Sequence, residues 1–488
     1  MHTTAIARTI LVAIFSSLAA LAALPAPAAA TGAAGVAPAT DHGDRVLAAI
    51  AAQVDPRRER RTLERLVGFG TRQTASDTRS ATRGIGAARR WVRARFAQIA
   101  AGCGGCLQPD SVPQVVTGPR FARPTRIVDE LGIQRGTTDP DRVVVISAHL
   151  DSRVSNVMNA TADAPGADDD GSGVAAVLEA ARVLSHYRFP ATIVYAVLSG
   201  EEQGLYGGKL LAATALARGW RVEAQLNNDI IGNVHGQNGV VDDTHVRVFS
   251  EGPKSGLGAL GIRELRDNGG EVDSPARNLA RYIARLAPRV LWNFHVRMIY
   301  RTDRFDRGGD QMPMLAAGFP AVRFTEAAEN YHRQHQDVRV ANGVAYGDVL
   351  SGVDFPYLAQ VTRLNAITLA SLAWAPPPPA VVRISGAVTP NTVVQWSAVP
   401  SAAGYRVWWR ETTDPQWRYR RWAGRVTRLL LPGVVIDDYF FGVSSVSADG
   451  FASPVEFPGP AGAFWTPSAT SSAPKSRNGA EQTVPTHR

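Results

Sequence analysis

The sequence predicts an α/β fold, with a mixed, mostly parallel sheet flanked by helices, followed by a small all-β sandwich. The larger region alternates apolar runs of strand length with amphipathic helical segments, the pattern of an open sheet covered by helices. After four prolines at 376–379, the chain changes to short strand-like runs that are rich in aromatic residues. We therefore expect a large α/β region and a separate small β region.

Three strand-like runs of the α/β region end in residues that commonly bind metal ions. These runs, with the polar residues that follow them, are 142–147 with His149 and Asp151, 192–198 with Glu201 and Glu202, and 222–226 with Asp229. Side chains alternate along a strand, so an adjacent pair such as Glu201 and Glu202 sends at least one carboxylate into a site. The carboxyl ends of parallel strands meet at one edge of an open sheet. The sequence thus predicts a metal centre at this edge.

A loop with three consecutive aspartates, Asp168 to Asp170, precedes a predicted helix. Apolar residues at 174, 177, 178, 181 and 184 follow the helical spacing i, i+3, i+4, i+7. Contiguous carboxylates repel one another, and a bound divalent cation relieves that repulsion. The alternative is a solvated acidic N-terminus stabilised by the helix dipole. Because the other ligand-bearing segments lie in the same region, we favour the cation.

Taken in chain order, these segments resemble the signature of peptidase family M28, zinc peptidases with a co-catalytic pair of zinc ions. That signature is a His-x-Asp, an Asp-rich loop ending in Ser-Gly, a Glu-Glu pair, a lone Asp and a final His. The matching segments are His149–Asp151, Asp168–Gly173, Glu201–Glu202 and Asp229. An ordered set of motifs is more specific than a single one. The resemblance covers roughly residues 45–374 and implies the zinc exopeptidase fold.

The resemblance also implies a role for each matched residue. The implied zinc ligands are His149 and Asp229 for one ion, Glu202 for the other, and Asp169 as the bridge between them. Glu201 would be the general base, and Asp151 would orient the His149 ring by accepting its second N–H. The implied reaction is hydrolysis of the N-terminal peptide bond by a water activated between two zinc ions.

Two histidines compete for the remaining ligand position. In the family this His is commonly followed by an Asp four residues later, whereas Asp337 lies five residues after His332 and two after His335. The stretch 334–339, Gln-His-Gln-Asp-Val-Arg, resembles a variant of this loop in bacterial members. We therefore favour His335 and keep His332 as the alternative.

The favoured function is a secreted zinc aminopeptidase whose substrates are the N-termini of peptides or proteins. A glutaminyl cyclase shares the fold and much of the ligand set but works with one zinc ion as an acyltransferase. The presence of both His149 and Asp229 favours two ions. A carboxypeptidase-type relative stays open, and a non-enzymatic binding protein on the same scaffold would be expected to have lost ligands.

The N-terminus predicts export. Residues 1–30 contain one arginine, an uncharged run at 10–24 and an end rich in small residues, as in a secretory signal peptide. The apolar run is too short for a membrane span, so we expect a secreted or periplasmic protein without a stable membrane anchor. The Ala- and Gly-rich segment 31–44 is expected to be disordered.

The only two cysteines, Cys103 and Cys106, are predicted to form a local disulfide in an oxidising compartment. A structural zinc site would need a second pair. The net charge of +9 gives no reason to expect nucleic acid as a partner. Many of its arginines lie on the polar face of an amphipathic helix at 87–96, and the chain has no recognisable nucleic-acid-binding module.

Two features of the expected enzyme domain, residues 45–374, concern its connections. Strands at about 124–135 and 142–149 are expected to form a hairpin through a turn at 137–141. An irregular glycine-rich insertion at 232–270 is longer than an ordinary connection, so it is expected to rim the substrate cleft.

Residues 375–380 are expected to be a stiff polyproline linker, and residues 459–488 a disordered tail. Between them, residues 381–458 resemble a fibronectin type III domain, with Trp396 and Tyr405 in its core and Tyr439 as its tyrosine corner. A further aromatic cluster consists of Trp408, Trp409, Trp417, Tyr419 and Trp422. Packing between strands explains them better than the alternative, a surface that binds glycan or protein.

Overall fold

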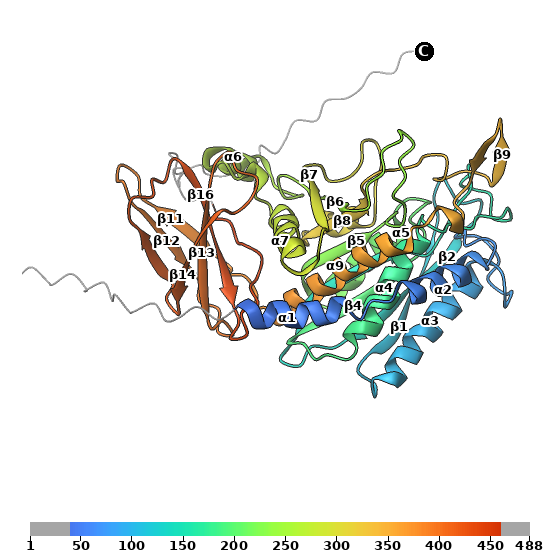
Figure 1. Cartoon of the computed structure of the whole chain (residues 1–488), viewed down its shortest axis with the longest axis horizontal. Helices are drawn as coiled ribbons and strands as arrows, with labels where there is room; N and C mark the ends of the chain where they lie inside the picture. Colours follow the sequence, from blue (N-terminus) through green and yellow to red (C-terminus); the bar gives the residue numbers. More distant parts are fainter. Residues whose placement is uncertain (1–39, 460–488) are drawn as a thin grey trace, which may run out of the picture. The chain divides into compact units, whose positions relative to one another are not determined.

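The computed structural model describes residues 40–459, and Figure 1 shows their arrangement. The expected signal peptide at 1–30 and the tail after residue 459 lie outside the described residues. The first helix, α1 (Thr40–Ala51), begins inside the segment that is expected to be disordered. Leu47 and Ile50 explain the earlier start, because both are buried in the main core and anchor the helix.

The α/β domain contains one eight-stranded sheet with the order β1-β2-β4-β3-β5-β8-β6-β7. Its strands are β1 (Gln108–Val116), β2 (Thr125–Gln134), β3 (Asp139–His149), β4 (Ala191–Leu198), β5 (Arg221–Asn228), β6 (His245–Phe249), β7 (His295–Ile299) and β8 (Ala321–Glu326). The four central strands β4, β3, β5 and β8 are parallel, whereas β2 and β6 pair antiparallel to them. The mixed sheet confirms the predicted fold class.

Helices cover both faces of this sheet (Figure 1). They are α3 (Gly84–Gly102), α4 (Gly171–Leu184), α5 (Tyr206–Ala217), α7 (Pro275–Val290), α8 (Gln311–Ala316) and α9 (Phe355–Trp374). Outside this layer, α2 (Pro56–Val67) packs on α4 and α9, and α6 (Ala259–Asn268) has no buried residue. Along β3, Val144 and Ile146 enter the core that contains α4 and α9, whereas Val143 and Val145 enter the core that contains α5 and α8. Burial on both faces explains why the central strands are continuous apolar runs.

Two predicted connections are wrong. β2 and β3 form no hairpin, because β4 lies between them, antiparallel to β2 and parallel to β3. The main-chain N–H groups of Thr137 and Asp139 instead donate to Phe189 and Pro190, just before β4. Pairing with a fully buried central strand thus prevails over the local turn signal at 137–141. The segment 232–270 is also more regular than expected, since it contains β6 and α6.

The C-terminal region contains two small antiparallel sheets, with strand orders β11-β12-β15 and β14-β13-β16. The strands are β11 (Val382–Ser385), β12 (Thr392–Trp396), β13 (Gly404–Glu411), β14 (Tyr419–Gly424), β15 (Arg428–Leu431) and β16 (Tyr439–Val446). Trp396 and Tyr405 are buried in its core as expected, with ring centroids 5.4 Å apart.

One aromatic assignment in this region, the tyrosine corner, needs revision, and the packing role predicted for Trp408 and Trp417 is confirmed. The hydroxyl of Tyr405 accepts from the main-chain N–H of Val399 at 2.6 Å, whereas the ring of Tyr439, the expected tyrosine corner, packs against Tyr419 and Phe441. Trp408 and Trp417 are buried, so strand and domain packing accounts for them. The stacked rings of Trp409 and Tyr419, 5.7 Å apart, remain partly accessible.

The prolines at 376–379 connect two regions that contact each other. Asp273 pairs with both Arg281 of α7 and Arg410 of β13. The ring of Trp374, at the end of α9, stacks on Phe451 at 5.0 Å. Residues 375–380 are therefore a short connection within a packed unit rather than a spacer that separates two bodies. In residues 40–459, no helix has the length and apolar character needed to cross a membrane.

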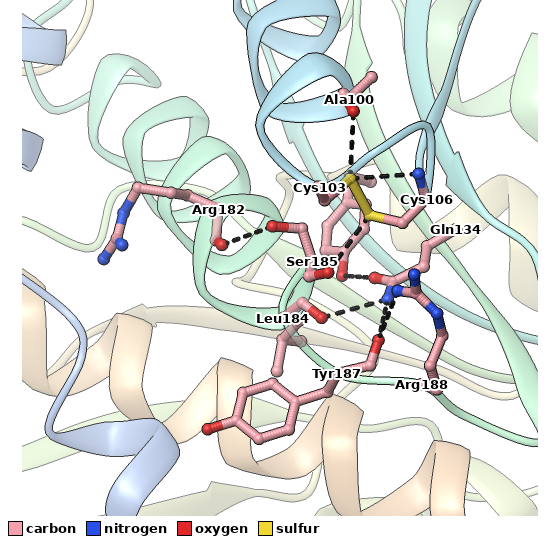
Figure 2. Close-up of a disulfide and its surroundings, with 10 residues drawn as sticks. Ala100, Cys103, Cys106, Gln134, Arg182, Leu184, Ser185, Tyr187 and Arg188 are labelled. Carbon is pink, nitrogen blue, oxygen red and sulfur yellow. Dashed lines mark hydrogen bonds between the residues drawn. A yellow bond between two sulfur atoms is a disulfide. The ribbon is translucent and has the colours of Figure 1, made fainter.

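The two cysteines form the expected local disulfide, Cys103–Cys106, after α3 (Figure 2). Gly104 and Gly105 between them have φ values of +68° and +83°, a conformation that glycine adopts without steric cost. Figure 2 also shows Gln134 at the end of β2, whose side-chain amide donates to the main-chain oxygens of Leu184 and Tyr187. The disulfide thus lies at the end of the domain where α3, β2 and α4 meet.

Candidate metal centre

Five side chains from five segments meet at one edge of the sheet. His149 is the last residue of β3, Asp229 follows β5, and Glu202 lies in the turn after β4. Asp169 lies in the loop before α4, and His335 lies in the loop after β8. Their ligand atoms form two groups of three, and within each group the atoms lie within 4.8 Å of one another. Asp169 belongs to both groups.

The two oxygens of Asp169 face two different histidines. Oδ1 lies 3.2 Å from Nε2 of His149, and Oδ2 lies 3.0 Å from Nε2 of His335. Nε2 of His335 is also 3.2 Å from Oε2 of Glu202, while Asp229 completes the group that contains His149. A carboxylate in this position can bridge two metal ions, as in sites where paired ions share a ligand.

The arrangement of the donor atoms suits binding of a metal ion better than hydrogen bonding among the side chains themselves. Nε2 of His149, Oδ2 of Asp169 and Oε1 of Glu202 are buried without a hydrogen-bond partner among the described residues. Unpaired buried polar atoms occur elsewhere in the described residues too, but these three lie together in the two ligand groups, and that convergence points to a bound ion. Burial alone would lower the pKa of His149, but the nearby carboxylates, Asp169 first, raise it well above its usual range. Imidazole nitrogens together with carboxylate oxygens are a donor set that suits zinc.

Asp151 acts differently from the prediction. Its carboxylate is 3.8 Å from Nδ1 of His149, whereas its main-chain oxygen is 3.0 Å away and takes the orienting position. The carboxylate instead accepts from the main-chain N–H groups of Gly200, Glu201 and Glu202, at 2.7, 3.3 and 3.2 Å. Asp151 therefore orients the ring through its backbone and fixes the turn that carries both glutamates.

The three consecutive aspartates have separate roles, which explains how the loop tolerates them. Oδ1 of Asp168 accepts from the main-chain N–H of Gly232 at 2.7 Å. Asp170 caps α4, because its Oδ1 accepts from the main-chain N–H of Gly173 at 3.0 Å. Only Asp169 presents its carboxylate to both groups of candidate ligands.

Two residues that hold the ligands were missed by sequence reasoning. Oδ2 of Asp348 accepts from the main-chain N–H of Asp169 at 2.7 Å, and its carboxylate also accepts from Asp168. Arg323 of β8 is fully buried and lies 2.6 Å from Oδ1 of Asp229. A charged residue inside the apolar run of β8 was a usable signal for Arg323. Asp348 lies far along the chain in no motif and left no signal.

Glu201 lies beside the metal ligands without being one of them. Its carboxylate belongs to neither group of three, and burial raises its pKa well above the usual range. Together with Asp169, Glu202, Asp229 and His335, it lines a cavity of about 410 Å³. A carboxylate in that position can exchange a proton with a molecule in the cavity.

His335, and not His332, reaches the ligand cluster. The ring of His332 instead packs edge-on against Tyr346, with centroids 4.8 Å apart. The geometry therefore favours His335 over His332 as the remaining metal ligand.

Comparison with solved structures gives the fold. LapA aminopeptidase of Legionella pneumophila aligns with a TM-score of 0.50 and 19% identity, covering 68% of this chain and 75% of that one. A glutaminyl cyclase of Porphyromonas gingivalis aligns with a TM-score of 0.45 and 15% identity, covering 65% of this chain and 98% of that one. At these identities the likeness to LapA supports the fold alone.

Comparison with sequences gives the family. Residues 131–350 match the model of peptidase family M28. A probable zinc metalloprotease of Pyricularia oryzae is 42% identical over 428 residues, which cover 86% of this chain and 85% of that protein. Another, of Leptosphaeria maculans, is 43% identical over 403 residues, covering 82% of this chain and 93% of that protein. With relatives of this identity and coverage, the chain belongs to peptidase family M28 and is a zinc metalloprotease.

Proposed function

We propose that this protein is an aminopeptidase that binds two zinc ions and hydrolyses the N-terminal peptide bond of its substrates. The observation that carries the proposal is the position of Asp169, which belongs to both groups of candidate ligands and faces a different histidine with each oxygen. His149 and Asp229 would complete one zinc site, and Glu202 and His335 the other. The unpaired buried donor atoms described above support occupancy of both sites.

Glu201 is the candidate general base. Held by these ligands, two zinc ions would lower the pKa of a water and polarise the scissile carbonyl. Glu201 lines the cavity and is held by the turn that the Asp151 carboxylate fixes. It can accept the proton of the attacking water and pass it to the departing amine. A carboxyl group whose pKa burial already raises is suited to both steps.

Three further parts of the proposal concern the regions outside the centre. Residues 1–30 direct the protein out of the cytoplasm, to the periplasm or the medium. The sheets of the C-terminal region form a fibronectin type III-like domain, and their three-plus-three strand pairing supports this assignment. The accessible stack of Trp409 and Tyr419 is the candidate contact for a glycan or protein partner.

Metal analysis together with a substrate panel tests the proposed function. We expect about two zinc ions per chain, hydrolysis of aminoacyl amides, loss of activity with a chelator and recovery with added zinc. One tightly bound zinc ion together with cyclisation of N-terminal glutamine would instead make the protein a glutaminyl cyclase. Release of residues only from the C-terminus would make it a carboxypeptidase.

A further inference from the structure

Four arginines line the same cavity as the metal-binding carboxylates. They are Arg120, Arg153, Arg304 and Arg307. In the proposed function, Asp169, Glu202 and Asp229 are metal ligands, and two divalent ions more than neutralise their charge. The guanidinium groups are therefore not needed to balance the ligands. An arginine is free to bind a charged group of the substrate only if its own charge is not already paired with a carboxylate of the protein.

Arg304 and Arg307 are balanced by residues behind the cavity wall. Their Nη1 atoms lie 3.3 and 3.5 Å from Oε2 of Glu329. Burial alone would raise the pKa of Glu329, but Arg304 and Arg247 lower it to about 2, so its negative charge is retained. Arg307 also donates to the side chain of Gln334 at 2.8 Å. This side of the cavity is an internal ion network.

Arg120 and Arg153 have no such balance. Among the described residues, the carboxylate that Arg153 approaches is that of Glu202, with Nη1 3.8 Å from Oε2, and Arg120 forms no ion pair. Nη1 of Arg120 donates to the main-chain oxygen of Glu202 at 2.9 Å. Nε and Nη2 of Arg153 donate to the main-chain oxygens of Val154 and Ser155, at 3.1 and 2.8 Å. These bonds fix the guanidinium, while its Nη1 stays on the cavity side beside a metal ligand.

We propose that Arg153 and Arg120 receive a carboxylate of the substrate, so that the enzyme prefers peptides with a carboxylate close to the cleaved bond. This inference rests on the proposed aminopeptidase function. Arg153 has 15% of its side-chain surface exposed, so its charge is only partly solvated. A fixed, partly desolvated guanidinium binds a carboxylate more strongly than a free surface arginine does. The carboxylate can come from an acidic side chain or from the C-terminus of a short peptide.

Substrate pairs of equal shape test this preference. Glu and Gln aminoacyl nitroanilides, and likewise Asp and Asn, place the carboxylate on the N-terminal residue. Ala-Glu-amide and Ala-Gln-amide place it on the second residue, and Ala-Ala against Ala-Ala-amide tests the terminal carboxylate. In at least one of these arms, we expect the acidic member to have a kcat/KM about tenfold higher.

Variants assign the preference to the two arginines. In Arg153→Gln, and more so in Arg120→Gln combined with Arg153→Gln, the acidic-to-neutral ratio of kcat/KM should fall about tenfold. Arg57→Gln, at an exposed position of α2 away from the cavity, should keep the wild-type ratio. Zinc content is measured for every variant, because Arg153 lies beside Glu202. A ratio that stays within twofold of wild type in both arginine variants, at full zinc content, overturns the inference.

A binding measurement separates this inference from the proposed function. Calorimetry with the zinc-loaded protein compares glutamate α-amide with glutamine α-amide, and Ala-Ala with Ala-Ala-amide, in the wild type and in Arg153→Gln, so that each pair differs by one carboxylate. If the protein hydrolyses none of the panel yet binds a carboxylate-bearing member better than its amide in a manner that depends on Arg153, the aminopeptidase proposal fails and the carboxylate site stands. If it hydrolyses neutral substrates best and binds neither carboxylate-bearing member better than its amide, the carboxylate site fails and the aminopeptidase stands.

Discussion

The candidate metal centre and the ion network around Asp273 are both buried clusters of charge, but their charges are balanced differently. At the metal centre, three carboxylates and two histidines converge, and several donor atoms have no partner among the described residues. At Asp273, each carboxylate oxygen lies 2.6 Å from an arginine, Arg281 on one side and Arg410 on the other, so the charges are balanced although Nη2 of Arg281 and Nε of Arg410 also lack a hydrogen-bond partner among the described residues. One cluster requires an added cation, and the other already contains its cations.

This difference separates a functional site from a structural one more clearly than burial or composition does. Burial of charge is costly in both places and is offset only when each charge has a partner. The Asp273 network obtains its partners from the chain, and it joins the α/β domain to the C-terminal domain. At the metal centre the charge partners must come from a bound ion, as expected for a site that binds ligands and substrate.

The largest effect is expected at Glu201 and Glu202, which are adjacent but have different roles. Glu201→Gln removes the base and retains the shape, so turnover should fall by about 10²–10⁴ while zinc content holds. Glu202→Gln replaces a charged ligand by a neutral one, so zinc and activity should be lost together. Metal analysis alongside steady-state kinetics distinguishes the two. If Glu201→Gln loses zinc and Glu202→Gln keeps it, the two roles are exchanged.

At the Asp273 network the expected effect is on stability rather than on metal. Asp273→Ala leaves Arg281 and Arg410 buried without their shared partner, which should lower the free energy of unfolding by about 3–5 kcal/mol. Zinc content of the folded protein should be unchanged. Asp414→Ala is the control, because it removes a carboxylate that lies 3.4 Å from the guanidinium of the exposed Arg418. This variant should lose less than about 1 kcal/mol of stability. Equal shifts of the urea midpoint in both variants would contradict the importance of the buried pair.

Glu59 of α2 represents a third case, a buried carboxyl group without an ion partner. Thr362 donates to its Oε1 at 2.5 Å, Oε2 has no partner in the described part of the chain, and burial raises its pKa to about 8 from 4.5. The folded protein therefore keeps a proton that the unfolded chain loses above pH 4.5. The stabilising contribution is complete below that pH and is lost as the pH rises towards 8.

The expected loss of unfolding free energy from this group is about 2–3 kcal/mol between pH 5 and pH 7. Glu59→Gln keeps the hydrogen bond to Thr362 and has no proton to lose, so it should flatten this dependence. Glu64→Gln, at an exposed position on the same helix, should leave the dependence unchanged. Urea unfolding at several pH values measures the slope. An equal slope in wild type and Glu59→Gln would show that Glu59 is not its source.

Sequence reasoning found the parts of the centre that lie at strand ends and in motifs. His149, Asp169, Glu202 and Asp229 come together as expected, because the carboxyl ends of neighbouring parallel strands meet. The same reasoning failed where tertiary pairing overrode local signals, as in the hairpin predicted between β2 and β3. It also missed Asp348, whose role depends on a loop folding back onto the aspartate segment 180 residues earlier.

The Asp273 network was equally invisible in the sequence. Its arginines lie 8 and 137 residues away, and arginines on helices usually face solvent. The polyproline stretch suggested separated domains. Composition indicates how stiff a connection is, but it does not show whether the regions on either side contact each other. Local pattern thus predicted the ligands of the centre, whereas the residues that hold them in place required the fold.

The smallest effect is expected at His332, and it tests whether the ligand cluster is assigned in the correct register. His332→Ala removes an edge contact with the Tyr346 ring, which should cost about 1 kcal/mol of stability and leave zinc content and kcat/KM within twofold of wild type. His335→Ala, three residues away in the same loop, removes a nitrogen that lies 3.0 Å from Asp169 and 3.2 Å from Glu202. That variant should lose one zinc ion and most activity. Because both variants replace a histidine of the same loop by alanine, any difference in their zinc content or activity reports the position of the side chain alone. If His332→Ala loses zinc and His335→Ala retains it, the ion is bound by the other histidine, and the loop after β8 adopts a different register in the metal-loaded enzyme.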